Sequence, residues 1–242
     1  IERAAARVDL VQVQGRCEPA FAHQFDGHPG LERAARAEHV ADVALQRADR
    51  YAAAEHLRGG LGLGDVAFLP GEASQPLDGR MIYLSWAEAG EGDTRGAAVG
   101  KGKLVCDAPT ACTIEGLTVI WRQTPKVTGR GHYSHRLTVS PDGKYLYVAS
   151  GERQKMQPAQ DTGVTLGKIV RLNLDGTPAA GNPMADKGGV TAEIWSMGHR
   201  NPLGLAFDAQ GRLWEHEMGP RGGDEMNLIE RGSNYGYPIV SD

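Results

Sequence analysis

The sequence predicts an all-β fold in which a unit of several short strands is repeated. Glycine accounts for 33 of the 242 residues, about twice its average usage, which indicates many tight turns. One turn motif also recurs at nearly even spacing, as Asp78-Gly79, Asp142-Gly143 and Gln210-Gly211. A turn that returns at a fixed period is typical of folds built from repeated supersecondary units.

Short apolar segments flank these turns and are predicted to be antiparallel strands. The segments before the turns are residues 65–68, 136–139 and 204–207. The segments after the first two turns, in which apolar residues alternate, are residues 81–86 and 145–149. Further strands are expected over residues 101–106, 117–122, 168–174 and 192–196. Each full repeat therefore holds four short strands.

A four-stranded repeat is the sequence signature of a β-propeller blade. A simple blade needs only about 40–50 residues, so the longer repeats of this chain contain long connecting loops. Two full repeats and the start of a third fit within the chain, whereas a closed propeller needs about four to eight blades. Residues 58–242 are therefore predicted to form a partial β-propeller, with function expected in its loops.

The charge and the hydropathy pattern exclude two classes of partner. The formal net charge is −4, so the chain lacks the basic balance that is typical of nucleic-acid binding. No run of residues approaches the roughly 18 consecutive apolar residues of a membrane-spanning helix. Neither a nucleic acid nor a membrane span is expected.

The cysteines are Cys17, Cys106 and Cys112. The last two flank a short polar loop and could form a disulfide in an oxidising compartment. Two unpaired thiols are an equal alternative, and the spacing does not decide between the two states.

Residues 96–101, Gly-Ala-Ala-Val-Gly-Lys, superficially match a phosphate-binding loop. Three residues separate the two glycines, however, where that motif needs four, and no Ser or Thr follows the lysine. The segment is therefore predicted to be an ordinary connecting loop.

Residues 1–57 differ in composition from the rest of the chain. They hold 14 alanines and half of the eight histidines but no lysine, and they show no blade repeat. Residues 31–57 have a helix-favouring composition with a broken apolar stripe. An Ala- and Arg-rich run is what a GC-rich gene yields in a wrong reading frame, so a frameshift or a mis-called start is the preferred explanation and a helical extension the alternative. The segment is left unassigned.

Four polar motifs between the predicted strands together resemble a known family. They are Gly-His-Tyr-Ser-His-Arg-Leu at 131–137, Gly-His-Arg-Asn-Pro at 198–202, Gly-Pro-Arg-Gly-Gly-Asp-Glu at 219–225 and Asn-Tyr-Gly-Tyr-Pro at 234–238. In this order they resemble the soluble quinoprotein sugar dehydrogenases of the glucose/sorbosone dehydrogenase family, over about residues 59–242. The resemblance implies a six-bladed propeller, of which roughly three blades are present here.

The resemblance also implies an activity. Family members use pyrroloquinoline quinone (PQQ) and calcium to oxidise aldose sugars at the anomeric carbon to lactones, and a separate electron acceptor takes the electrons. The compartment implied is the periplasm or the exterior of the cell.

The resemblance assigns three residues to the chemistry. His132 heads a His-x-x-x-Arg-Leu pattern and is expected to be the general base, a role that suits an imidazole because its unperturbed pKa is about 6.5. Arg200 and Asn201 are expected to contact PQQ, since the planar guanidinium of arginine matches a carboxylate with two hydrogen bonds.

Two calcium sites are implied as well. The carbonyls of Gly219 and Pro220 match the residues that hold the calcium of the cofactor, and calcium accepts neutral carbonyl oxygens as readily as carboxylates. Asp224 and Glu225, with the carbonyl of Tyr235, match a second, structural calcium site.

Two positions depart from the family pattern. His135 stands where the family usually has a small residue, so either the pocket is narrower or the turn is altered. Met218 stands where several members have Gln or His, and a thioether cannot replace the hydrogen bonds of those side chains.

Two alternative functions remain open. A propeller of this family could bind partners without redox chemistry, although the presence of His132 and Arg200 argues against this. A calcium-dependent propeller lactonase is the other alternative, and the His-Arg-Asn-Pro run argues against it.

Overall fold

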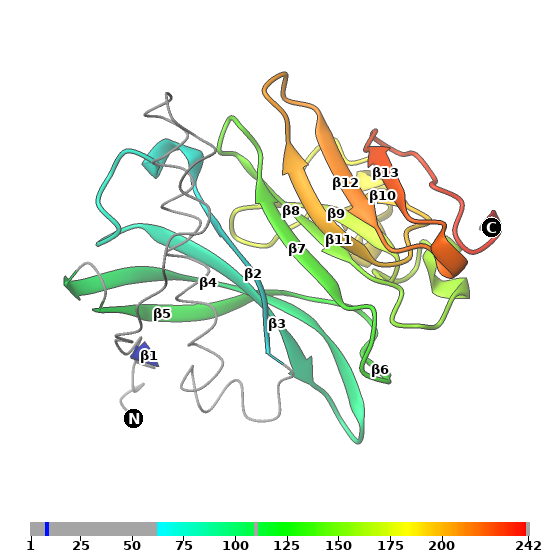
Figure 1. Cartoon of the computed structure of the whole chain (residues 1–242), viewed down its shortest axis with the longest axis horizontal. Coiled ribbons are helices and arrows are strands. Elements are labelled where there is room, and N and C mark those ends of the chain that lie inside the picture. Colours follow the sequence, from blue (N-terminus) through cyan, green and yellow to red (C-terminus); the bar gives the residue numbers. More distant parts are fainter. Residues whose placement is uncertain (1–7, 10–61, 109–110, 241–242) are drawn as a thin grey trace.

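The computed structural model describes residues 8–9, 62–108 and 111–240, which form an all-β structure of three antiparallel sheets (Figure 1). The first sheet contains β1 (Val8–Asp9), β2 (Leu63–Phe68), β3 (Met81–Ala89), β4 (Thr94–Ala108), β5 (Ala111–Arg122) and β6 (Val127–Thr128). The second contains β7 (Ser134–Val139), β8 (Tyr145–Ser150), β9 (Lys168–Asn173) and β10 (Ile194–Met197). The third contains β11 (Pro202–Phe207), β12 (Leu213–Glu217) and β13 (Glu225–Leu228).

Helical structure in the described ranges is limited to short 3-10 turns. These are η1 (Pro70–Glu72), η2 (Gln157–Gln160), η3 (Ala185–Lys187), η4 (Gly189–Glu193) and η5 (Pro220–Gly222). None of these turns has the length or the apolar character that a membrane span requires.

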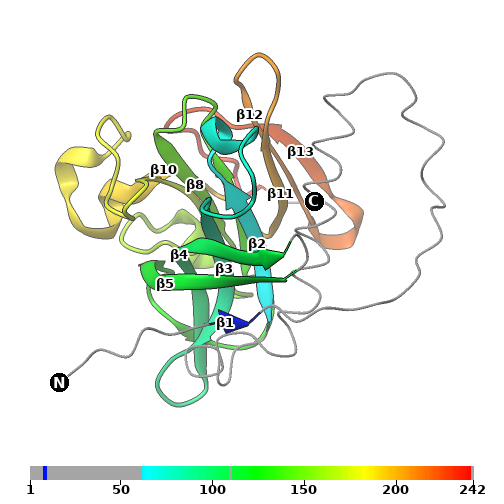
Figure 2. The same cartoon turned by 90° about the vertical axis from the view of Figure 1, so that its left-hand side faces the viewer.

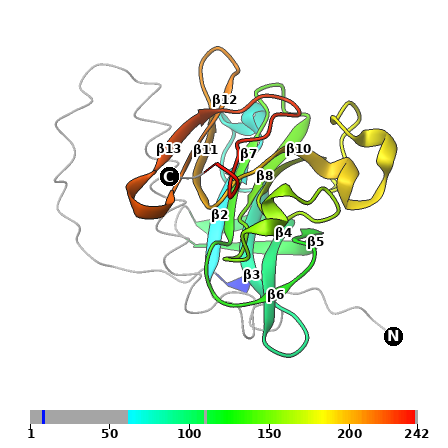
Figure 3. The same ribbon diagram turned by 90° about the vertical axis from the view of Figure 1, so that its right-hand side faces the viewer.

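Each sheet is built in chain order from its first strand outward, as a propeller blade is. The strand orders are β2-β3-β4-β5 with β1 beyond β5 and β6 beside β4, then β7-β8-β9-β10, then β11-β12-β13. The first strands lie together, with β2 against β7 and β7 against β11. Figure 2 shows the molecule from the side of the first sheet and Figure 3 from the side of β13. The predicted all-β partial propeller is confirmed.

Strand β8 explains how the sheets stack. Its side chains alternate between two faces, as the period of two in a strand requires. Leu146 and Val148 pack in a core with Tyr83 and Val99 of the first sheet. Tyr147 and Ala149 instead pack in a core with residues of the third sheet. The alternating pattern in the sequence is therefore that of a central strand buried on both faces.

The prediction of a loop at residues 96–101 is wrong, because these residues lie within β4. Ala97, Ala98 and Val99 are fully buried. The glycine at position 100 reflects close packing, since a Cβ there would lie 2.9 Å from the ring of Trp86. Small residues are needed where the Trp86 side chain lies against β4. A run of Gly and Ala is also typical of loops, so the sequence alone suggests a loop here.

A disulfide joins Cys106 and Cys112, which face each other across the β4–β5 pair. Of the two alternatives left open by the sequence, the disulfide is the one observed.

The expectations for residues 1–57 lie outside the described residues, apart from β1. This strand adds to the outer edge of the first sheet, with Val8 opposite Ile114 of β5.

His135 lies at the start of β7 and packs against β2. Its backbone is in the left-handed region, with a φ of 44°, which glycine adopts without strain. A Cβ on Gly64 of β2 would lie only 1.7 Å from Nδ1 of the His135 ring. The turn is therefore shaped for a small residue, and the imidazole fits because Gly64 has no side chain. Burial, together with the positive charge of Arg136, lowers the pKa of His135 to about 4.

We predict that His135 makes the protein less stable in acid. Its pKa is about 4 in the folded state, below the ordinary value of 6.5, so between these pH values the unfolded chain binds a proton that the folded chain rejects. Stability should therefore fall as the pH falls from 6.5 to 4, by up to about 3 kcal/mol. His135→Asn removes the titration, and asparagine tolerates a positive φ.

Urea unfolding between pH 4 and 7.5 measures this effect, with the exposed His216→Asn as the control. The His135 variant should lose less stability in acid than the wild-type chain does. An unchanged pH dependence in His135→Asn would contradict the assignment.

Candidate active site

The loops that carry the expected site residues lie at one end of the second and third sheets. Neighbouring strands run antiparallel, so the start of β7, the end of β8, the start of β11 and the end of β12 lie at the same end. His132 precedes β7, Arg200 and Asn201 precede β11, and Gly219 follows β12. The topology thus gathers residues that are far apart in the sequence.

His132 is paired with a buried carboxylate. Its Nδ1 hydrogen-bonds Glu152 Oε1, and Glu152 is fully buried just beyond the end of β8. The other oxygen, Oε2, accepts hydrogen bonds from the backbone N–H groups of Lys155 and Met156, the latter at 2.6 Å. Burial raises the pKa of Glu152, but the hydrogen bonds from His132 and these backbone groups outweigh it and lower the pKa overall. The ionised carboxylate fixes the proton on Nδ1 and leaves Nε2 available as a base.

The two loops around this pair are strained and tightly joined. Left-handed backbone occurs at several non-glycine residues, namely His132, Ser134, His135, Arg153, Gln154 and Met156. A Cβ on Gly151 would lie 2.1 Å from the carbonyl oxygen of His132. The buried Arg153 guanidinium donates to the carbonyls of Gly129 and Gly131, at 2.5 and 2.9 Å, and stacks on Tyr133. Such strain is maintained only where surrounding contacts impose it, and it is concentrated at functional sites in proteins.

Glu217 holds the Arg200–Asn201 segment. Its Oε2 accepts hydrogen bonds from the backbone N–H groups of Arg200 at 2.6 Å and Asn201 at 2.8 Å. The side chain of Arg200 donates from Nη1 to the carbonyl oxygens of Met218 at 2.7 Å and Gly219 at 3.4 Å. Glu217 is buried at the end of β12, so its carboxylate depends on these donors.

This segment also contacts the His132 loop. The backbone N–H of Glu152 donates to the carbonyl of Arg200 at 3.0 Å, and the Ser134 hydroxyl donates to Asn201 Oδ1 at 3.2 Å. The structure thereby brings together His132, Arg200 and Asn201, as the sequence predicts.

Gly219 and Pro220 form a tight turn that presents backbone oxygens. A Cβ on Gly219 would lie 1.6 Å from the carbonyl oxygen of Gly223, so only glycine fits. Asp224 Oδ1 accepts from the N–H of Gly219 at 3.0 Å. The turn thus places several hard oxygen donors close to Arg200, and this donor chemistry fits calcium.

The second expected calcium set lies at the start of β13 and in the C-terminal motif. Glu225 is exposed, and its Oε2 accepts from the side-chain amide of Asn227 at 3.0 Å, whereas Asp224 faces Gly219. Tyr235 hydrogen-bonds through its hydroxyl to the carbonyl of Leu228.

Sequence reasoning missed Glu152 and Glu217. Each lies at or just beyond the end of the second strand of its sheet, and a carboxylate that follows a buried apolar strand is a detectable signal. The hydrogen-bond partners could not be predicted in the same way, because His132 lies 20 residues from Glu152, and Asn201 and Arg200 lie 16 and 17 residues from Glu217.

Comparison with known proteins places the chain in a family. The family model described as Glucose / Sorbosone dehydrogenase matches residues 31–242. The chain belongs to this family. The match begins upstream of residue 58, within the segment that the sequence left unassigned.

Three relatives illustrate the membership. The chain is 40% identical over 182 residues to aldose sugar dehydrogenase YliI of Escherichia coli, covering 74% of this chain and 47% of that protein. A solved glucose dehydrogenase is 42% identical with a TM-score of 0.68, over 74% of this chain and 51% of its own. The PQQ-bound aldose sugar dehydrogenase of Streptomyces coelicolor is 31% identical with a TM-score of 0.61, over 74% and 49%. The chain thus spans about half the length of each of these three relatives.

We predict that Glu217→Gln loosens the Arg200–Asn201 segment. Removing the charge from a buried acceptor of two hydrogen bonds should lower the free energy of unfolding by about 1–3 kcal/mol. The amides of Arg200 and Asn201 should also exchange faster with solvent in hydrogen-exchange experiments.

The exposed Glu225→Gln is the matched control, and both variants are measured in chelator so that bound metal does not contribute. If Glu217→Gln is no less stable than the control and the two amides remain protected, the carboxylate does not hold this segment.

Proposed function

We propose that the protein is a PQQ- and calcium-dependent dehydrogenase that oxidises an aldose sugar at its anomeric carbon to the lactone. The observation that carries the proposal is the His132–Glu152 pair next to the Arg200–Asn201 segment. Membership of a sugar dehydrogenase family supports it, as does a solved relative whose description is the PQQ-bound form of an aldose sugar dehydrogenase.

His132 is the general base of this proposal. Its Nε2 takes the proton from the anomeric hydroxyl, and the Glu152 carboxylate on Nδ1 stabilises the imidazolium that forms. Glu152 also prevents the ring from rotating, because its own position is fixed by two backbone N–H groups. When bound, PQQ supplies the two-electron acceptor for the anomeric hydrogen, and calcium makes that acceptor more electrophilic.

The remaining residues hold the cofactor and the metals. Arg200 offers its guanidinium to carboxylate or quinone oxygens, and Asn201 can both donate to and accept from the same ring system. The carbonyls of Gly219 and Pro220 would bind the calcium of the cofactor.

The structural calcium is assigned to Asp224 and Glu225 with the carbonyl of Tyr235. All three are hard oxygen ligands of the kind that calcium prefers.

The compartment and the electron acceptor follow from the same proposal. The Cys106–Cys112 disulfide supports an oxidising environment, which agrees with a periplasmic or secreted protein. Electrons leave the reduced cofactor to a separate acceptor.

We predict that His132→Ala lowers the turnover of aldoses by about 10²–10⁴-fold while leaving PQQ affinity largely unchanged. The assay follows the sugar-dependent change in quinone absorbance in protein loaded with PQQ and calcium, and the exposed His216→Ala is the control. Turnover within a few-fold of wild type would mean that His132 is not the base. Lactone hydrolysis without any change in absorbance would favour a lactonase, and binding without either reaction would favour a non-catalytic module.

We also predict that removing calcium with a chelator abolishes quinone reduction and lowers the melting temperature. An ion that binds only the folded state stabilises it by mass action, so returning calcium should restore both properties. Full activity and an unchanged melting temperature in excess chelator would contradict the calcium assignment.

A further inference from the structure

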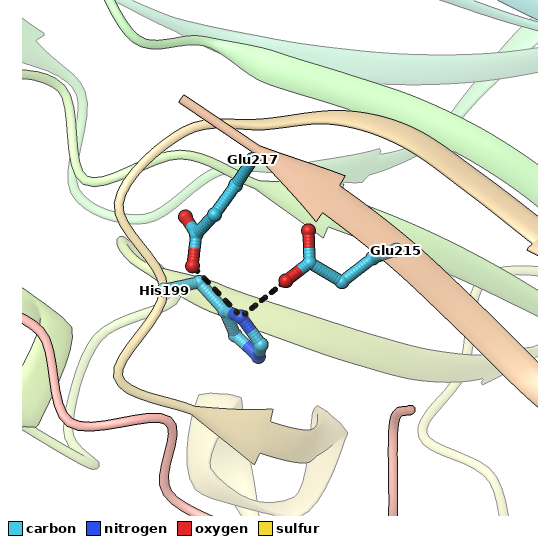
Figure 4. Close-up of side chains that lie close together, drawn as sticks. All are labelled: His199, Glu215 and Glu217. Carbon is cyan, nitrogen blue, oxygen red and sulfur yellow. Dashed lines mark ion pairs between the residues drawn. The ribbon is translucent and has the colours of Figure 1, made fainter. Parts of the chain in front are cut away.

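A second cluster of ionisable side chains lies behind the Arg200–Asn201 segment. His199, Glu215 and Glu217 are 0%, 2% and 4% exposed, and their side chains converge (Figure 4). His199 Nδ1 lies 3.6 Å from Glu215 Oε1 and 3.8 Å from Glu217 Oε1. The three ligand atoms lie within 4.8 Å of one another. None of these three residues has a role in the proposed reaction as a ligand of PQQ or calcium.

These separations are too long for direct hydrogen bonds, which span about 2.7–3.2 Å. Two ligands of one metal ion, each about 2.0–2.2 Å from it, lie roughly 3–4 Å apart. His199 Nδ1 and Glu215 Oε2 are both buried without a hydrogen-bond partner among the described residues. Buried polar atoms rarely lack a hydrogen-bond partner, so a proton or a metal cation is expected between the imidazole nitrogen and the carboxylate.

The other atoms of the three side chains are already engaged. His199 Nε2 lies 2.8 Å from the Ser196 hydroxyl, which can fix this nitrogen as the protonated one. The side-chain amide of Asn227 donates to Glu215 Oε1 at 3.0 Å. Glu217 uses Oε2 for two backbone N–H groups and leaves Oε1 toward His199. Outer hydrogen bonds of this kind orient the ligands of metal sites.

The charge of the cluster also favours a bound cation. Two carboxylates beside a neutral imidazole bring two negative charges into a buried space, and this is unfavourable without compensation. Burial lowers the pKa of His199, but Glu215 and Glu217 outweigh it and raise the pKa overall. The cluster therefore attracts either a proton or a metal ion to Nδ1, and a divalent ion would neutralise both carboxylates.

We propose that His199, Glu215 and Glu217 bind a divalent transition-metal ion of the zinc type, distinct from the two calcium sites. An imidazole nitrogen with two carboxylate oxygens suits zinc, whereas calcium prefers oxygen ligands alone. The ion ties β12 to the loop before β11 and so stiffens the Arg200–Asn201 segment from behind. The site does not depend on the proposed dehydrogenase function.

The primary test uses the wild-type 242-residue chain, stripped with chelator and titrated with zinc chloride alone. One equivalent should bind tightly in the presence of excess calcium, and the melting temperature should rise by about 5–10 °C at about a hundredfold excess over Kd. X-ray absorption at the zinc edge should show nitrogen and oxygen ligands without sulfur. Failure to bind zinc, or a sulfur-containing shell, overturns the proposal and leaves His199 as a protonated partner of the two glutamates.

Variants identify the ligands. Glu215→Gln keeps an acceptor for Asn227 but removes a ligand charge, and His199→Gln removes the nitrogen, so each should weaken zinc binding at least about tenfold. Glu88→Gln in the first sheet is the matched control, and His132→Ala tests the other His–Glu pair. Wild-type affinity in Glu215→Gln and His199→Gln, or a loss in His132→Ala, would overturn the assignment. If the ligand variants do not fold, the absorption spectrum of the wild-type chain decides.

Discussion

Buried carboxylates at the ends of two strands hold the candidate active site together. Glu152 and Glu217 are 0% and 4% exposed, and a buried carboxylate is costly unless donors surround it. The donors are His132, the N–H groups after Glu152, and those of Arg200 and Asn201. Satisfying each carboxylate therefore fixes the conformation of a loop. The groups with expected catalytic and binding roles are positioned by the same hydrogen bonds that make burial of the acids tolerable.

The antiparallel topology makes this arrangement possible. Loops from the second and third sheets meet because the strands that they join begin or end on the same side. The core beneath them is rigid, since β8 is buried on both faces, with Leu146 and Val148 on one and Tyr147 and Ala149 on the other. A packed platform of this kind allows the loops above it to adopt left-handed backbone at His132 and Arg153 without unfolding.

Glu217 connects two clusters that differ in chemistry. One oxygen holds the backbone of Arg200 and Asn201, and the other faces His199 in the buried cluster with Glu215. A change of charge in the His199–Glu215–Glu217 cluster would therefore alter the electrostatic environment of Arg200 and Asn201, which are expected to contact the cofactor. The ring of Tyr235 stacks on His199, so the C-terminal motif is linked to the same cluster.

The sequence alone determined most of the β-strands and their repeat, because alternation and turn residues are local signals. Its ordered motifs implied, through the family resemblance, that His132, Arg200 and Asn201 belong to one site. The tertiary structure decided what depends on distant partners. Residues 96–101 form a strand because they pair with β3 and β5, and Gly100 leaves room for the Trp86 ring. The Cys106–Cys112 pair forms because β4 and β5 place these residues opposite each other. Glu152 and Glu217 acquire their roles only when folding brings donors from other loops, since a carboxylate in a sequence does not indicate which groups will surround it.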